Sequence, residues 1–358
     1  TGASNVAVGY QSLDANTTGD NNTALGHRAL DANTTADNNT GVGAFALNSN
    51  TTGTQNTSVG VFALDHNTTG SNNTTIGHSS LGANTTGVSN TSMGSEALDA
   101  NTTGDFNTAI GRQALTNNTT ADNNTAVGRA ALSANTTGAS LNAVGANALD
   151  ANTTGSFNNA FGQNCMGANT TGHRNTAMGQ DSFQANTTGA RNTAVGNSAL
   201  AFNTTADNNT AVGNNALVAN TTGASSVAVG AFALQNTTTG SQCTALGDNA
   251  GVRNTTGGNN TYLGRIAGFS TGQTGSNNTY IGYNAQGTTD STSNEIILGD
   301  ANIAVIRCNQ TSLTGLSDRR DKTEIVDIPV GLNFINKLKP VKFKWQTREG
   351  TSQDGKIR

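Results

Sequence analysis

The chain has 358 residues, of which 34% are hydrophobic and 4% aromatic, and its formal net charge is −4. A weakly acidic chain lacks the general basic surface that binds nucleic acid, so we expect no nucleic-acid partner. No apolar run approaches the roughly 20 residues of a membrane-spanning helix, and no membrane span is predicted.

A seventeen-residue unit repeats sixteen times without insertion or deletion, starting at Thr1, Thr18, Thr35 and so on to Thr256. It reads T-G-x-x-N-T-A-V-G-x-x-A-L-x-A-N-T, and its residues are numbered as positions 1 to 17. Position 9 is Gly in all sixteen copies, position 8 is always apolar, and position 16 is Asn in fourteen copies. Such strict phase indicates a stack, because a lost residue would misalign every later step.

The unit is too short for a pair of helices, which needs roughly 33 residues or more, and Gly, Asn and Thr are poor helix formers. We therefore predict an all-β fold, a parallel β-solenoid or β-roll in which each unit forms one coil. N-T-A-V-G is expected to form one strand and A-L-x-A-N a second, with Gly and Asn at the corners. The Asn residues at position 16 are expected to stack in a hydrogen-bonded ladder.

The glycine at position 9 is the same in every unit of this chain, which indicates a positive φ or a close approach of another backbone. Position 2 does not require glycine, because three units have alanine there: Ala36, Ala121 and Ala206. Position 13 is Leu in most units, but the last two units have Gly251 and Gly268 there and place Val252 and Phe269 one residue later.

Large apolar residues fall at positions 8 and 13, whereas positions 7 and 9 are small and lie on the opposite face of the strand from position 8. One of these faces is expected to pack inside the coil and the other against a neighbouring chain. This arrangement predicts a homo-oligomer, most simply a homotrimer around the axis of the stack. A monomeric solenoid with a narrow core is the alternative.

Cys165 and Cys243 lie five coils apart, roughly 24 Å, which is beyond the reach of a disulfide. The four histidines fall at three different positions of the unit, and no C-x-x-C spacing occurs. We therefore predict no metal site and no cofactor. Asn-x-Thr sequons, as at Asn16, are better explained by ladders and corners than by glycosylation, which stays open.

The phase breaks at about Gln273, where one extra residue precedes a returning motif at Thr279–Ala285. We assign residues 1–272 to the repeats and residues 273–316 to a degenerate repeat, a loop and a capping β element within Glu295–Cys308. Composition then changes, because the first of six lysines is Lys322. Residues 317–358 are assigned to the start of a further domain, with a short helix over 331–338 and a strand over 341–345.

The segment Ser317–Trp345 reads SDRRDKTEIVDIPVGLNFINKLKPVKFKW. It resembles the start of the C-terminal intramolecular chaperone of endosialidase-type phage tail spikes and fibres. That family has a mixed α/β chaperone domain, which trimerises the fibre ahead of it and then cuts itself off by a serine-dependent reaction. Its motif of a Ser-Asp pair, a basic residue and a lysine corresponds to Ser317, Asp318, Arg320 and Lys322.

The resemblance implies that Ser317 is the nucleophile, Lys322 its general base, and Leu316–Ser317 the bond that is cut. A desolvated lysine is neutral often enough to take the proton of a serine hydroxyl. The family's domain is longer than the forty-one residues that follow Ser317, so cleavage is expected only where the domain is complete.

The repeats have their own resemblance. N-T-A-V-G is similar, over about five residues per unit, to the Ser-Val-Ala-Ile-Gly-type units of trimeric autotransporter adhesin heads, which are β-rolls joined as trimers. The period of those units is shorter. This resemblance supports a trimeric β-roll rather than any particular ligand.

These observations predict the shaft of a phage or viral tail fibre, extracellular and part of the virion, trimerised by a C-terminal chaperone. The alternatives are a bacterial trimeric surface adhesin and an ice-binding solenoid with rows of Thr at positions 6 and 17. Activity on an external substrate is not expected, because the array has no catalytic triad, acid pair or phosphate loop. A host receptor or glycan would bind at the variable positions 10, 11 and 14, for example at Tyr10, His27, Arg112, Arg129 and Asp181.

Overall fold

The computed structural model describes residues 2–270 and 272–305. Every strand described lies in the first of two units, Thr1–Ile303. Ser317 and Lys322, and the helix and strand expected after them, lie outside the described residues.

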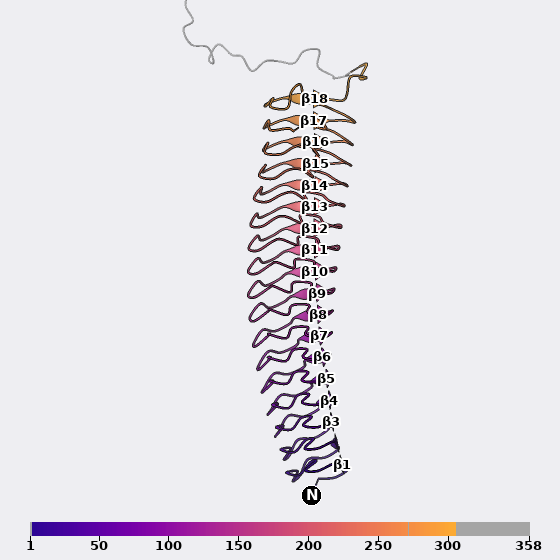
Figure 1. Cartoon of the computed structure of the whole chain (residues 1–358), viewed down its shortest axis with the longest axis vertical. Helices are drawn as coiled ribbons and strands as arrows, with labels where there is room; N and C mark the ends of the chain where they lie inside the picture. The colour runs from indigo at the N-terminus through magenta and orange to yellow at the C-terminus, as the bar shows by residue number, and fades with distance from the viewer. Residues whose placement is uncertain (1, 271, 306–358) are drawn as a thin grey trace, which may run out of the picture. The chain divides into compact units, whose positions relative to one another are not determined.

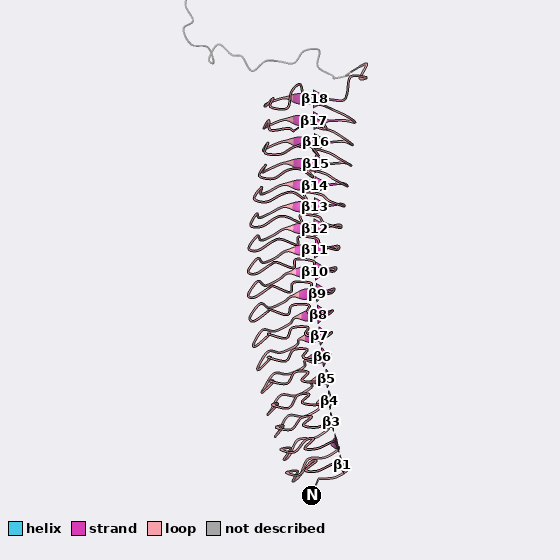
Figure 2. Cartoon of the chain, in the orientation of Figure 1, coloured by secondary structure: helices cyan, strands magenta, loops and turns pink. Residues whose placement is uncertain are grey.

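Each coil contributes one strand of three residues, and the strands stack into a single sheet (Figure 1). The described residues contain no helix, and the remainder of each coil is loop and turn (Figure 2). The strands are β1 Val6–Val8, β2 Thr23–Leu25, β3 Thr40–Val42, β4 Thr57–Val59, β5 Thr74–Ile76, β6 Thr91–Met93, β7 Thr108–Ile110, β8 Thr125–Val127, β9 Asn142–Val144, β10 Asn159–Phe161, β11 Thr176–Met178, β12 Thr193–Val195, β13 Thr210–Val212, β14 Val227–Val229, β15 Thr244–Leu246, β16 Thr261–Leu263, β17 Thr279–Ile281 and β18 Ile296–Leu298.

All neighbouring strands pair in parallel, and the register confirms the predicted β-solenoid. Thr23 pairs with Thr40, seventeen residues later, and this offset is kept as far as β16. Thr261 then pairs with Thr279, so the break near Gln273 is a single inserted residue. β18 pairs in parallel with β17 and supplies the strand expected after Glu295.

The core of each coil is formed by positions 7, 12 and 13. Ala24, Ala29 and Leu30 are completely buried, and the same three positions are buried in most coils. The predicted second strand, A-L-x-A-N, is wrong, because these residues form turns. Leu30 has φ +53, a left-handed conformation that interrupts extended backbone, and burial of its side chain offsets the conformational cost.

The glycine column at position 9 has both of the expected causes. Gly43 has φ +131, and a Cβ built on it would lie 2.5 Å from the carbonyl oxygen of Gly60 in the next coil. A side chain would therefore be excluded by conformation and by contact. A Cβ on Gly19, at position 2, would lie as close to a carbonyl oxygen, 2.4 Å from that of Ala36, but Gly19 has no left-handed φ. Alanine occurs at the equivalent Ala36, so the left-handed φ is what distinguishes position 9.

Two ladders of buried asparagine join the coils. At position 16, as predicted, Asn50 Nδ2 donates to Asn33 Oδ1 at 3.1 Å and to the carbonyl oxygen of Gly53 at 2.9 Å. A second ladder at position 5 was not predicted: Asn22 Oδ1 accepts from the backbone amide of Asn39 at 2.9 Å. These amides satisfy backbone groups that face the inside of the coil, where water is excluded.

The core changes in the last coils of the array. Gly251 and Gly268 replace the leucine of position 13, and the freed space is filled by the ring of Tyr262, which enters from position 7 of the strand. Val252 is buried, but Phe269 is 39% exposed and lies beneath the guanidinium of Arg253. The displaced apolar residues therefore do not both replace the missing leucines.

Candidate functional site: the outer face of the sheet

The two sides of most strands differ in size and exposure. Position 7 points into the coil and is small in most coils, as with the fully buried Ala160. Position 8 points outward and is large: Phe161 is 40% exposed and Met178 is 47% exposed. The narrow coil accepts the small face, so the large apolar residues lie outside.

The outward residues of position 8 form an unbroken column, which we call the apolar ladder. Its members pair from strand to strand along the whole sheet. They are Val8, Leu25, Val42, Val59, Ile76, Met93, Ile110, Val127, Val144, Phe161, Met178, Val195, Val212, Val229, Leu246, Leu263, Ile281 and Leu298. A contiguous apolar surface of this extent is unusual on a protein without a partner.

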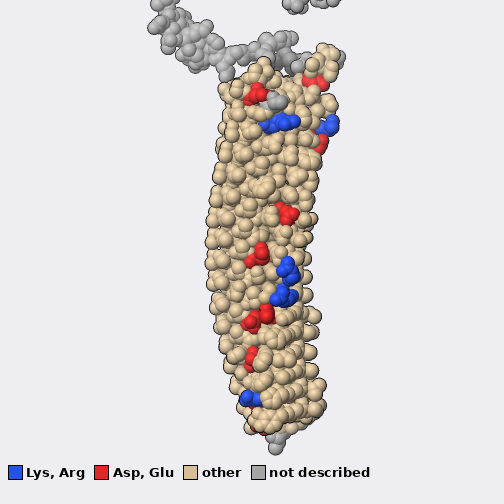
Figure 3. Space-filling view, viewed as in Figure 1, with Lys and Arg blue, Asp and Glu red and all other residues tan. Residues whose placement is uncertain are grey.

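A column at position 6 runs beside the apolar ladder, and most of its members are threonine, as at Thr57 and Thr74. None of the eighteen strands contains a charged residue. Figure 3 likewise shows few Lys, Arg, Asp or Glu residues on the face that it presents. Depletion of charge around an apolar centre is the composition of a protein interface core.

Two edges border this outer face. The leading edge is position 4, two residues before each strand, and the trailing edge is positions 10 and 11, directly after the glycine of position 9. Residues at positions 4 and 11 have left-handed φ, as at Arg174 (+58) and Asp181 (+54). All the arginines of the described repeats except Arg253 lie along these edges, whereas most of the aspartates lie at positions 3 and 14.

The trailing edge of the first five coils carries a row of aromatic rings. Tyr10 stacks on His27 with centroids 5.6 Å apart, and Phe45 stacks on Phe62 at 5.1 Å. His27 meets Phe45 edge-on at 4.9 Å, and His78 ends the row. Tyr10 and His27 are exposed, as predicted for variable positions. Their rings stack on each other, so one face of each ring is covered.

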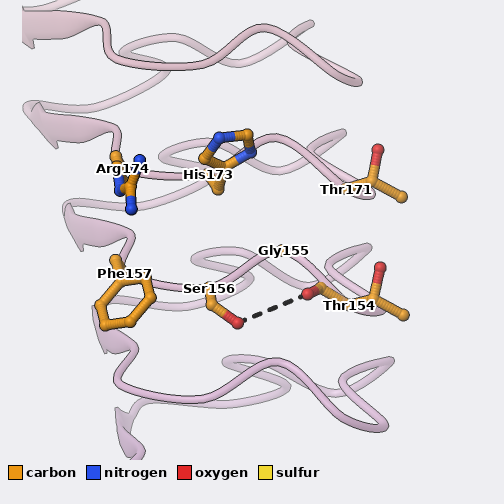
Figure 4. A pocket seen from close by; sticks show the side chains of 7 residues that line it. All are labelled: Thr154, Gly155, Ser156, Phe157, Thr171, His173 and Arg174. Atoms are coloured by element: carbon orange, nitrogen blue, oxygen red, sulfur yellow. Dashed lines mark hydrogen bonds between the residues drawn. The ribbon is translucent and has the colours of Figure 1, made fainter.

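A shallow pocket of about 260 Å³ lies along the leading edge between two successive coils (Figure 4). Phe157 and Arg174 lie one above the other on its strand side, and Thr154 and Thr171 lie at its far end. Arg174 makes no ion pair with any described residue. The pocket offers an exposed ring and a free guanidinium but no arrangement for covalent chemistry.

The two described cysteines are buried between the coils and act as small apolar side chains. Burial raises the pKa of the Cys165 thiol to about 12, and it also raises the pKa of Cys243, so both remain protonated at neutral pH. Both cysteines are free, as their separation predicted. No group of three His, Cys, Asp or Glu side chains within the described coils could hold a metal ion.

The apolar ladder was visible in the sequence, but its exposure was not. Periodicity assigned positions 7 and 8 to opposite faces and left open which one lies inside. The predicted catalytic residues Ser317 and Lys322 are not placed, because they fall outside the described range. Among described residues, no helix is long and apolar enough to cross a membrane.

Comparison with known proteins adds information on the C-terminal segment. Residues 317–358 match the family described as the chaperone of endosialidase, Peptidase_S74. No curated protein matches the chain, and no solved structure matches it. The match covers the segment that follows the solenoid and not the solenoid itself.

Proposed function

We propose that the chain forms the shaft of an extracellular fibre, in which three parallel copies associate through their apolar ladders. The observation that carries this proposal is the uncharged, apolar outer face that extends over eighteen strands. Three copies around a common axis would bury all three ladders at once in a closed arrangement. Burial of this surface is the driving force for association.

The family match at residues 317–358 supports a role for the C-terminal segment in assembly. Nearly identical coils could associate out of step at little cost, because a shifted ladder is still apolar. A chaperone that joins the three C-termini first would remove this ambiguity. By resemblance, Ser317 then cleaves the Leu316–Ser317 bond with Lys322 as base, and the chaperone is released.

A phage or viral tail fibre is the assignment that we favour, with a bacterial surface adhesin as the alternative. In either case a host receptor or a glycan would bind at variable positions that the association of the copies leaves exposed, such as position 14. An attachment domain that is viral or bacterial in type, found in the full-length gene product, would discriminate between the two.

The ice-binding alternative has less support. The hydroxyls at position 17 are not free: Thr51 Oγ1 donates to the carbonyl oxygen of Thr68 at 3.0 Å, and this contact recurs along the stack. The row at position 6 borders a ladder of bulky apolar side chains, which do not match an ordered layer of water. Measurable thermal hysteresis would restore this alternative.

The experiment is a measurement of mass by light scattering, on the protein produced with a complete C-terminal domain of this family. We expect three times the chain mass, and on a denaturing gel a cut near Ser317 that is absent in Ser317→Ala. Phe161→Asp with Met178→Asp should lower the mass to one chain, because the interface would bury two charges.

The matched control is Phe202→Asp, since Phe202 is also an exposed apolar residue but lies away from the strands. It should leave the mass unchanged. A single-chain mass for the unaltered protein would refute the proposal.

A further inference from the structure

The two edges of the outer face are chemically different in one coil of the array. Arg174 is the leading-edge residue of the coil that contains β11, and Asp181 is its trailing-edge residue. Arg174 is exposed and has no carboxylate partner within the described coils. Asp181 accepts a hydrogen bond from Asn164 Nδ2 at 3.1 Å and has no cationic partner there.

These two residues cannot meet within one chain. Six residues lie between them, and this segment contains the extended strand Thr176–Met178. At about 3.3 Å per residue, extended backbone of this length spans roughly 20 Å. An arginine side chain cannot cross the outer face to reach Asp181 of its own coil.

Parallel copies arranged around an axis have heterologous contacts, in which the leading edge of one copy lies beside the trailing edge of the next. We propose that Arg174 of each copy pairs with Asp181 of its neighbour, and that this ion pair holds the copies in register. The inference rests on the proposed parallel assembly and names the contact that aligns it. A guanidinium and a carboxylate at the rim of an apolar interface are complementary in charge and hydrogen bonding.

A second pair lies on the same two edges, at positions 4 and 10 of its coil. Phe106 is the leading-edge residue of the coil that contains β7, and its ring is exposed. Arg112, on the trailing edge of that coil, has no ion-pair partner among the described residues. Aligned copies place the Arg112 guanidinium of one chain beside the Phe106 ring of the next, as in a cation–π contact.

Misaligned copies would lose the ion pair. A shift of one coil brings Arg174 opposite Asn164 or Ser198, which occupy position 11 of the coils below and above. The other leading-edge arginine, Arg191, is already paired with Asp207 of its own chain at 3.5 Å. Only a shift of five coils offers Arg174 a comparable acceptor at position 11, Glu96.

The test is a cysteine pair, Arg174→Cys with Asp181→Cys, in the protein carrying a complete C-terminal domain of the family. After mild oxidation we expect covalent trimers on a non-reducing denaturing gel. Cys308 is replaced by serine in every variant, and the native Cys165 and Cys243 are fully buried and contribute no background. The matched control pairs Arg174→Cys with Asn164→Cys, one coil out of step, and should cross-link at least tenfold less.

Light scattering separates the failure of this inference from the failure of the proposed fibre. A trimer in which the two cysteine pairs cross-link equally would overturn the inference and leave the fibre. A single-chain mass would overturn both.

A charge exchange provides an independent readout. Arg174→Glu should lower the temperature at which the trimer dissociates, and adding Asp181→Arg should restore most of the loss. Arg191→Glu, which breaks only a contact within one chain, should not be rescued by Asp181→Arg. Equal effects of Asp181→Arg on both backgrounds would exclude the proposed pair.

Discussion

The ring of Tyr262 lies in the space that a side chain on Gly251 would need: a Cβ on Gly251 would be 2.5 Å from Tyr262 Cδ2. Gly251 retains the left-handed φ, +62, that leucine adopts at this position in other coils. One large residue from the strand has therefore replaced one large residue from the turn. Core volume is conserved, although two positions have each departed from the repeat.

This exchange predicts a pair of compensating substitutions. Tyr262→Ala should lower the free energy of unfolding by about 3–5 kcal/mol, because neither Gly251 nor Gly268 fills the cavity. Adding Gly251→Leu should recover part of that loss, whereas Gly251→Leu alone should destabilise by overlap with the ring. Urea denaturation of the four proteins gives the coupling energy, and additive effects would contradict the exchange.

The glycine of position 9 and the glycine found at position 7 of the same coil make a controlled comparison. Gly43→Ala should cost at least about 2 kcal/mol, from its φ of +131 and its contact with the Gly60 carbonyl. Gly41→Ala should be neutral or slightly stabilising, because position 7 is alanine in most coils. Hydrogen exchange of the amides in the surrounding coils reports both effects locally. Equal protection in the two variants would refute the steric explanation.

The asparagine ladder has a gap that can be repaired. Thr237 occupies position 16 and accepts from Asn254 Nδ2 at 3.1 Å, but it has no amide to donate to Asn220. Asn220 Oδ1 is consequently buried without a partner in the described structure. Thr237→Asn should raise the free energy of unfolding by about 1–2 kcal/mol.

Thr237→Val is the control for this repair. It keeps the size of the side chain but cannot accept from Asn254, so it should destabilise. If Thr237→Asn also destabilises, the unsatisfied oxygen is not the limiting feature of this junction.

Asp99 should make the solenoid less stable as pH rises. Burial raises the pKa of its carboxyl above the ordinary 3.8, and the negative charges of Glu96 and Asp65 add to the effect. The folded chain therefore holds this proton more tightly than the unfolded chain. The stabilisation is complete below pH 3.8 and is lost as pH rises through the raised pKa.

Asp99→Asn should remove this contribution, so that the variant is the more stable protein at pH 7. Denaturation midpoints measured from pH 3.5 to pH 7 check the prediction. Curves for the two proteins that stay parallel over this range would show that Asp99 does not titrate in the window.

The repeat length, the parallel stack, the β-class and the ladder at position 16 followed from the spacing of Gly, Asn and apolar residues. The orientation of the strands did not follow, since alternation separates position 7 from position 8 without saying which is inside. The turn at Leu30 could not be predicted, because its left-handed φ is a cost accepted for burial, and propensity opposes it. The role of Tyr262 could not be predicted, because the sequence does not show that its ring occupies the space next to Gly251.

The edges of the outer face could likewise be predicted only in part from the sequence. The variable positions were expected to be exposed, and Tyr10 and Arg112 are. The sequence did not show that these residues border the outer face of the sheet, because that requires knowing which side of the strand points outward. Arg174 had not been singled out, since no neighbour in sequence distinguishes it from a solvated arginine.

The hydrogen bonds between strands join each coil only to the coils directly before and after it. A pull along the stack therefore loads these junctions in series, and each bears the full tension. Such a rod has no redundancy along its length: it would give way at its weakest junction and lengthen in steps of seventeen residues. Side-by-side association of several rods would share the load, so the mechanical strength of the assembly would come from its width.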